Sequence, residues 1–297
     1  MECLSFPLFI TWNITSNCNL RCKHCFRTEY EHNLLTNKKI DEFINLFIKH
    51  NVEAVILTGG EPLTSKKIFY ILKKLQGKIK VGIATNGILL TEEMIKKLLY
   101  YNVKSFQISL DGASASINDY IRGNGVFNNV IRNIKKLQEY HCDITLAMTV
   151  NSFNYEDILN NSLYLIEKLK IKKFRIEYYI PVNKNEYFHS VTYDEMTKLC
   201  NTLKLNKPDN VMIQFPKFDS RTGCGAGIYN CILNSDLTIS PCDLLTHKYR
   251  SKPVDNIELF QKFWLEDLSF IQWRRKMSCF SCENKYKCLA IEEVKNE

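Results

Sequence analysis

A short run of cysteines near the start of the chain limits what this protein can be. Cys18, Cys22 and Cys25 are spaced C-x3-C-x2-C and follow an apolar, strand-like run at 9–14. Thiolates this close in one loop can converge on a single metal centre, and soft sulfur ligands select iron–sulfur clusters or zinc. A structural zinc site or an electron-transfer [4Fe–4S] cluster takes four protein ligands, so three cysteines leave one metal position open to a substrate or cofactor. The alternatives are three buried thiols, or a zinc site that His24 completes.

The loop resembles the cluster loop of the radical S-adenosylmethionine (SAM) superfamily, in which an aromatic-type residue, here His24, precedes the last cysteine. The resemblance implies that Cys18, Cys22 and Cys25 hold a [4Fe–4S] cluster. It also implies that the amino and carboxylate groups of SAM chelate the open iron, and that His24 borders the adenine.

A glycine pair after the next apolar run points to the same family. Residues 54–57 (Ala-Val-Ile-Leu) are typical of a buried strand, and residues 58–62 (Thr-Gly-Gly-Glu-Pro) follow. Adjacent glycines at a strand end let backbone approach a ligand closely, and a proline there ends strand pairing. A tight turn is the alternative explanation. The motif resembles the one that binds the amino group of the methionine moiety in radical SAM enzymes, which implies cofactor contacts for Gly59, Gly60, Glu61 and Pro62.

Short apolar runs alternate with amphipathic helical patterns along the first 180 residues. The predicted strands are 9–14, 54–57, 81–85, 106–110, 144–150 and 174–180, and the predicted helices are 40–48, 65–75, 91–101, 126–140 and 155–169. Such alternation forms parallel βαβ units, whose ligands gather at the carboxyl ends of the strands. The sequence therefore predicts an α/β fold, a partial (β/α)6 TIM-like barrel, and the resemblance implies the same fold.

Polar residues follow two further predicted strands. Asn86 comes directly after 81–85, and Ser109 and Asp111 lie at the end of 106–110. In the family that the chain resembles, the matching Ser and Asp lie near the ribose and carboxylate of the cofactor. Arg122 resembles the arginine of an arginine–glycine turn in peptide-modifying members, where it can pair with the cofactor carboxylate. Ordinary turns and a surface arginine are the alternatives.

The last quarter of the chain predicts a second metal site. Residues 230–233 and 237–240 flank a hairpin turn, and the section as a whole resembles the SPASM extension and its shorter form, twitch, which hold auxiliary Fe–S clusters. Two positions depart from that pattern, because Leu237 replaces the usual glycine and Glu292 replaces a cysteine. The six cysteines of this section are Cys224, Cys231, Cys242, Cys279, Cys282 and Cys288.

These six thiols are too few for two clusters of four thiolates each. Either Cys224, Cys242, Cys279 and Cys282 bind one cluster in the twitch manner, which we favour, or two clusters form with an open or non-cysteine position. In the first case Cys231 and Cys288 are alternative ligands, substrate contacts, hydrogen-atom donors or buried thiols. Zinc is the alternative metal. The predicted domains are the barrel at 1–182, a linker at 183–216 and the auxiliary-cluster domain at 217–297.

Composition excludes several other classes of protein. The chain has 297 residues, 45% hydrophobic, and a formal charge of +8 that is spread along the sequence, so we expect a sizeable core and no nucleic-acid partner. No apolar run is long enough for a membrane span, and the first residues lack the features of a signal peptide. We therefore expect a cytoplasmic protein without a membrane partner, in which the twelve cysteines serve metal rather than disulfides.

The resemblance predicts reductive cleavage of SAM to a 5′-deoxyadenosyl radical, which abstracts a hydrogen atom from the substrate. It favours a ribosomally made peptide as substrate, with epimerisation, thioether formation or another cross-link as the outcome, and a one-electron reductant such as flavodoxin or ferredoxin. Because the first strand begins near residue 9, we expect no N-terminal leader-binding domain and allow for a separate leader-binding protein. The alternatives are a twitch-type small-molecule dehydrogenase or cofactor-biosynthesis enzyme, and a non-enzymatic Fe–S or zinc scaffold. No catalytic residue is assigned.

Overall fold

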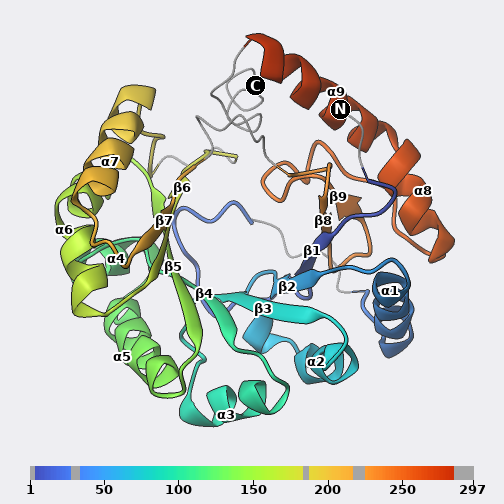
Figure 1. The fold of residues 1–297 in the computed structure, drawn as a ribbon, viewed down its shortest axis with the longest axis horizontal. Helices are drawn as coiled ribbons and strands as arrows, with labels where there is room; N and C mark the ends of the chain where they lie inside the picture. Colours follow the sequence, from blue (N-terminus) through green and yellow to red (C-terminus); the bar gives the residue numbers. More distant parts are fainter. Residues whose placement is uncertain (1–3, 28–33, 183–186, 217–224, 284–297) are drawn as a thin grey trace. The chain divides into compact units, whose positions relative to one another are not determined.

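The computed structural model describes residues 4–27, 34–182, 187–216 and 225–283, with only the backbone for 276–283. Figure 1 draws the chain as a ribbon. By their contacts the described residues form two compact units. Unit 1 holds the described parts of 1–19, 29–83 and 217–297, and unit 2 holds those of 20–28 and 84–216. The domain boundaries predicted at 182 and 216 rest on family resemblance and stay a prediction.

Strand β1 (Phe9–Asn13) lies in the middle of the unit 1 sheet. It pairs in parallel with β2 (Ala54–Thr58) on one side and with β8 (Asn230–Leu233) on the other. Strand β2 pairs in parallel with β3 (Lys80–Thr85), and β8 pairs antiparallel with β9 (Ile239–Ser240). The predicted strands and hairpin are confirmed, whereas the pairing of β8 with β1 was not predicted.

Four α-helices and one short 3-10 helix accompany these strands. They are α1 (Asn37–Lys49), η1 (Pro62–Thr64), α2 (Ile68–Leu75), α8 (Glu258–Glu266) and α9 (Leu268–Glu283). Helix α1 begins where the Thr36 side chain accepts a hydrogen bond from the Lys39 N–H, an N-cap that supplies a partner for a backbone donor at the helix start.

An aromatic core joins both ends of the chain in unit 1. The Trp12 ring of β1 lies 6.2 Å from Phe43 and 5.7 Å from Phe47, both on the predicted buried face of α1. Phe260 of α8 packs edge-on against the same two phenylalanines, at 6.1 and 6.0 Å. All four side chains are fully buried, and burying each stabilises the fold by about 1.5–3 kcal/mol. Helix α8 therefore packs into the same hydrophobic core as β1 and α1.

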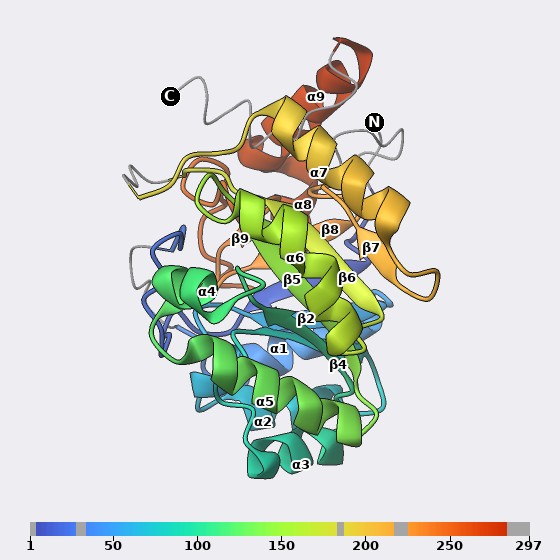
Figure 2. The ribbon, with the colours of Figure 1, turned by 90° about the vertical axis from the view of Figure 1, so that its left-hand side faces the viewer.

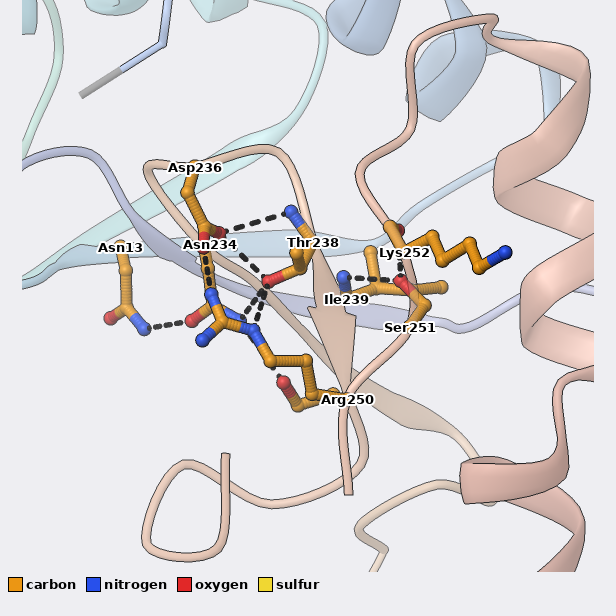
Figure 3. A network of polar contacts seen from close by, with 9 residues as sticks. Asn13, Asn234, Asp236, Thr238, Ile239, Arg250, Ser251 and Lys252 are labelled. Atoms are coloured by element: carbon orange, nitrogen blue, oxygen red, sulfur yellow. Dashed lines mark hydrogen bonds and ion pairs between the residues drawn. The ribbon is translucent and has the colours of Figure 1, made fainter. Parts of the chain in front are cut away.

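A polar network fixes the β8–β9 hairpin to β1 (Figure 3). The Asn13 side-chain amide donates to Asn234 Oδ1 at 2.8 Å, and Asn234 Nδ2 donates to Thr238 Oγ1 at 3.1 Å and to Ser240 Oγ at 3.0 Å. The turn contains Leu237 with φ +68°, at the position where the resembled family carries glycine. The side chain of Leu237 is buried, which helps to offset the cost of the left-handed backbone.

Unit 2 contains four parallel strands in sequence order. They are β4 (Ser105–Ser109), β5 (Asp143–Val150), β6 (Lys173–Tyr178) and β7 (Met212–Gln214), and each pairs with the next. Parallel pairing brings the carboxyl ends of neighbouring strands to one edge of the sheet, where ligands of such folds bind. The short strand β7 was not predicted.

The helices of unit 2 are α3 (Glu92–Tyr100), α4 (Ala115–Arg122), α5 (Val126–Glu139), α6 (Tyr155–Lys168) and α7 (Tyr193–Asn206). Helices α5 and α6 cover one face of β5 and β6 (Figures 1 and 2). Helix α3 begins where the Thr91 side chain accepts a hydrogen bond from the Met94 N–H, close to the start predicted from the sequence. Helix α4 was not predicted. Among the described helices, none is both long enough and apolar enough to cross a membrane.

We predict that Asn234→Ala destabilises the protein by about 3 kcal/mol, because it leaves several buried polar groups without partners. Denaturant unfolding of the metal-free protein measures the change. Asn160→Ala is the matched control, since Asn160 lies on the exposed side of α6 and its amide donates to the exposed carboxylate of Glu156. Equal stability of the two variants would contradict a stabilising role for the network.

Candidate functional site

The Gly-Gly-Glu motif contacts the segment that leads into the cysteine loop, at the carboxyl ends of β1 and β2. The Ile14 N–H donates to Thr58 O at 2.9 Å, which extends the pairing of the two strands by one step. The Gly60 N–H then donates to Thr15 O at 2.8 Å, and the Glu61 N–H donates to Asn17 O at 2.7 Å. The chain that leads into the cysteine loop is thus held along its length by the Gly-Gly-Glu motif.

This contact explains why both motif positions are glycine. Gly59 has φ +138°, and a Cβ there would lie 2.1 Å from Thr15 O. A Cβ on Gly60 would lie 2.3 Å from Asn17 O. Real Cβ atoms do not come this close to backbone oxygen, so a side chain at either position would push the two segments apart. The close backbone approach predicted from the glycine pair is therefore made to the chain itself, and a contact with the cofactor stays a prediction.

Glu61 carries a buried carboxylate in the same turn. Its side chain is fully buried, and its Oε1 accepts from the Leu63 N–H at 3.1 Å as the N-cap of η1. Pro62 occupies the first turn of η1, where the missing N–H of proline costs nothing. The Thr64 hydroxyl donates to Glu61 O at 2.7 Å, which closes the turn.

The second half of the cysteine loop belongs to unit 2, and a tight turn shapes it. The Cys25 N–H donates to Cys22 O at 3.1 Å, so the two cysteines occupy the ends of one turn. The Lys23 N–H donates to Ile121 O at 2.9 Å, which ties the loop to the last turn of α4. Cys22 is half-buried and Cys25 is exposed, while Cys18, in unit 1, is half-buried.

A buried carboxylate holds the side chains that flank this loop. Asp111, directly after β4, is fully buried, and its Oδ2 lies 3.1 Å from His24 Nε2 and 2.6 Å from Arg122 Nε. Its Oδ1 accepts from the Thr149 N–H at 2.8 Å. The His24 and Arg122 side chains are themselves only 12% and 9% exposed, so this group of three charged or polar side chains is shielded from water.

Electrostatics keep the pair ionised despite its burial. Burial alone would raise the pKa of Asp111, but the Arg122 guanidinium and then His24 hold it well below the usual range. Burial alone would lower the pKa of Arg122, but the Asp111 carboxylate, followed by the thiolates of Cys22 and Cys25, raises it. The guanidinium is therefore stabilised in its charged form by the Asp111 carboxylate and also by negative charge in the cysteine loop.

The structure thus brings His24, Asp111 and Arg122 together, three residues that the sequence assigned to different parts of the cofactor. Ser109 ends β4 and is half-buried. Asn86 is buried after β3, and its Oδ1 accepts from the Ile88 N–H at 3.0 Å. Their predicted contacts with the cofactor stay predictions.

Three asparagines that the sequence reasoning missed support these strand ends. Asn118 Oδ1 accepts from the Asp111 N–H at 3.0 Å, and Asn154 Nδ2 donates to Asp111 O at 2.9 Å. Asn133 Nδ2 donates to Gly87 O at 2.8 Å. All three side chains are buried. Asn133 could have been identified from the sequence, because it lies on the apolar face of α5, where a polar side chain needs a buried hydrogen-bond partner.

The auxiliary cysteines are described only in part. Cys231 lies in β8, fully buried, and burial raises the pKa of its thiol well above the usual range, which favours a core thiol over a ligand. Cys242 is half-buried after β9, and the neighbouring Asp243 accepts from Asn13 Nδ2 at 3.0 Å. Cys279 and Cys282 are residues of α9 for which the structure describes only the backbone. Cys224 and Cys288 fall outside the described residues.

The donor set fits an iron–sulfur cluster by its chemistry. Across the described ranges, no three His, Cys, Asp or Glu side chains form a group that could hold a metal ion. Cys18 belongs to one unit while Cys22 and Cys25 belong to the other, so convergence of the three thiols is a prediction. The turn that joins Cys22 to Cys25 and the softness of the three donors both suit iron–sulfur ligation.

A family model described as the Radical SAM superfamily matches residues 12–161. This chain belongs to the radical SAM superfamily. The matched segment contains the cysteine loop, the Gly-Gly-Glu motif and the Asp111–Arg122 pair. Membership confirms the family predicted from the cysteine spacing and the glycine motif.

Two curated relatives differ in what they do. The chain is 26% identical over 321 residues to the AdoMet-dependent heme synthase of Methanosarcina barkeri, a match that covers 95% of this chain and 90% of that protein. It is 31% identical over 160 residues to the mycofactocin maturase MftC of Mycolicibacterium smegmatis, which covers 52% of this chain and 41% of that protein. The chain thus spans nearly all of one relative and less than half of the other.

Solved structures confirm the fold class. Streptococcus suis SuiB bound to its precursor peptide SuiA matches with a TM-score of 0.75 at 19% identity, covering 92% of this chain and 67% of SuiB. SuiB bound to S-adenosylmethionine gives a TM-score of 0.76. At this level of identity the likeness concerns the fold alone, and it confirms the predicted α/β fold of the partial TIM-like barrel type.

We predict that Gly59→Ala destabilises the protein by more than about 3 kcal/mol, because it combines a clash with Thr15 O and a strained backbone. Gly77→Ala is the control, since Gly77 also has positive φ but a Cβ added there would meet no atom within 4 Å, which predicts a cost of about 1 kcal/mol. Thermal and denaturant unfolding of both variants test the difference. Equal costs would show that the close approach between the two motifs does not constrain residue 59.

Proposed function

We propose that this radical SAM enzyme binds SAM and a [4Fe–4S] cluster at the carboxyl ends of its parallel strands. Cys18, Cys22 and Cys25 would hold the cluster. When bound, the two cofactors supply one-electron chemistry that generates a 5′-deoxyadenosyl radical for hydrogen-atom abstraction. The observation that carries the proposal is a pair of backbone hydrogen bonds, Gly60 to Thr15 and Glu61 to Asn17. They join the motif that would bind the methionine end of the cofactor to the segment that enters the cysteine loop.

The chain's own residues orient the cofactor in this proposal. Gly59, Gly60, Glu61 and Pro62 form a turn whose backbone is fixed before any ligand arrives, so little ordering entropy is lost on binding. Asn86 follows β3 and Ser109 ends β4, where both would bind the adenosine part of SAM. Arg122 lies near the cysteine loop, where it would bind the carboxylate of SAM. Asp111 holds His24 by a contact of 3.1 Å, and His24 would border the adenine. Preorganised groups of this kind stabilise developing charge without rearranging during the reaction.

We further propose that the substrate is a ribosomally made peptide. The likeness of the fold to SuiB, which was crystallised with a precursor peptide, and the match to a mycofactocin maturase support this class. A small-molecule cofactor substrate is the second candidate. It is supported by the heme synthase relative, whose length this chain covers almost completely.

The proposal includes further components. At least one auxiliary Fe–S cluster would be held by Cys224, Cys242, Cys279 and Cys282, a flavodoxin or ferredoxin would supply the electron, and a separate protein would bind a peptide leader. In the described part of this section, Cys242 is half-buried, whereas Cys231 is a fully buried thiol of the sheet. We place the reaction in the cytoplasm because reduced thiols and iron–sulfur clusters persist there.

We predict that replacing Cys18, Cys22 and Cys25 together with alanine abolishes the formation of 5′-deoxyadenosine, because no thiolate ligand of the loop remains. Anaerobic incubation with SAM and dithionite, followed by chromatography, measures the product. Cys142→Ala is the control, since Cys142 lies between α5 and β5, outside the predicted metal-binding cysteines, and should leave the rate unchanged. Continued formation of 5′-deoxyadenosine by the triple variant would refute the assignment.

Substrate class is tested by offering the reconstituted enzyme two kinds of molecule. The first is a short peptide encoded beside the gene, and the second is a set of haem-like tetrapyrroles. A peptide whose mass rises by about one unit in deuterated water indicates epimerisation, and one that loses about two units indicates a cross-link. Turnover of a tetrapyrrole with no change in the peptide would favour the second candidate.

A further inference from the structure

In the proposed function Asp111 positions His24 and Arg122 serves the cofactor carboxylate, but neither task explains why the two side chains form a buried ion pair. Asp111 and Arg122 form an ion pair of 2.6 Å in which the carboxylate side chain is fully buried and the guanidinium side chain is 9% exposed. Burying two charges costs free energy even when they are paired, and such pairs often contribute little net stability. The pair lies beside the half of the cysteine loop that carries Cys22 and Cys25.

Two contacts attach the pair to this loop, and an electrostatic attraction acts beside them. His24, between Cys22 and Cys25, reaches Asp111 Oδ2 with its Nε2 at 3.1 Å. The Lys23 N–H donates to Ile121 O at 2.9 Å, one residue before Arg122. The guanidinium also attracts the thiolates of Cys22 and Cys25, which help to raise the pKa of Arg122.

The carboxylate is held more rigidly than a solitary ion-pair partner would be. The Thr149 N–H donates to Asp111 Oδ1 at 2.8 Å, the Asp111 N–H donates to Asn118 Oδ1 at 3.0 Å, and Asp111 O accepts from Asn154 Nδ2 at 2.9 Å. The side chain and both backbone polar groups of Asp111 are therefore fixed by hydrogen bonds. A fixed, buried charge acts on its surroundings with little screening by solvent or salt.

We propose that the Asp111–Arg122 pair sets the reduction potential of the cluster bound by the cysteine loop, with Asp111 as the positioning residue that holds Arg122 and His24 beside that loop. This inference rests on the proposed function, because it assigns the pair a task at the same cluster. The reduction potential of an Fe–S cluster depends on net charge, hydrogen bonds to sulfur and exposure to solvent. Arg122 favours the reduced, more negative cluster, and Asp111 opposes it.

The two charges make opposite predictions when each is removed. Asp111→Asn leaves a positive charge uncompensated beside the cluster, so the midpoint potential shifts to more positive values. Arg122→Gln leaves a negative charge, so the midpoint potential shifts to more negative values. The double variant removes both charges and returns the potential to near the wild-type value.

A purely structural ion pair would behave differently. Loss of either partner would then destabilise the protein or loosen the loop, and both single variants would change the cluster in the same direction. Opposite signs in the two single variants and their cancellation in the double variant therefore identify an electrostatic role.

The experiment is an anaerobic redox titration of the reconstituted protein without SAM, monitored by the EPR signal of the reduced cluster. Adding SAM at the end of each titration identifies the signal of the loop cluster, because only a cluster with an open iron responds to SAM. Iron content and thermal unfolding of each variant report whether the cluster loads and the protein folds. Arg175→Gln is the matched control, because Arg175 pairs with Glu177 at 2.9 Å on β6 with a side chain that is 40% exposed.

Arg122→Lys keeps the test decisive if Asp111→Asn fails to fold or to load a cluster. This variant disturbs the packing of Arg122 as Arg122→Gln does but retains the positive charge. We expect its potential to lie near the wild-type value and above that of Arg122→Gln. Equal potentials for the Lys and Gln variants, or unchanged potentials in all variants with a loaded cluster, would overturn the inference alone. A wild-type protein without a SAM-responsive cluster would overturn the proposed function as well.

Discussion

Backbone groups that leave a parallel sheet must find new hydrogen-bond partners, and in this protein that constraint shapes the candidate site. In unit 1, the N–H groups of Gly60 and Glu61 find carbonyls at Thr15 and Asn17, so the glycine motif and the entry to the cysteine loop hold each other. In unit 2, the Thr149 N–H at the end of β5 donates to the Asp111 carboxylate that follows β4. The glycine motif and Asp111 are therefore each held by backbone groups at a neighbouring strand end.

The same constraint accounts for the buried charges near the loop. A carboxylate that accepts a backbone N–H stays ionised more readily, and a guanidinium beside it reduces the cost of burial. Asp111 consequently keeps its negative charge inside the protein, and His24 and Arg122 are drawn to it. Because His24 is part of the cysteine loop, Asp111 connects this loop to the buried side chain of Arg122. One buried carboxylate thus holds two side chains of unit 2.

Local patterns in the sequence predicted much of the fold. The alternation of apolar runs and helical faces predicted strands β1 to β6 and helices α1 to α3, α5 and α6 with small errors at their ends, and the motifs fell at strand ends as expected. Helix α4 was missed because it is only eight residues long, so its apolar residues Ile117, Tyr120 and Ile121 span little more than one turn. The pairing of β8 with β1 joins residues more than 200 positions apart, and a local pattern carries no record of such a partner. For the same reason, the sequence placed Asp111 and Arg122 near a cofactor without indicating that they bind each other.

The central claim is that three thiolates hold an iron cluster whose fourth iron is left open for SAM. Mössbauer spectroscopy of protein reconstituted with 57Fe, recorded with and without SAM, tests it most directly because the method distinguishes the iron sites of one cluster. We predict that SAM changes the spectrum of a single iron at the loop cluster and leaves the other three as they were. Irons that do not respond to SAM, or zinc in place of iron in protein purified without oxygen, would contradict the claim.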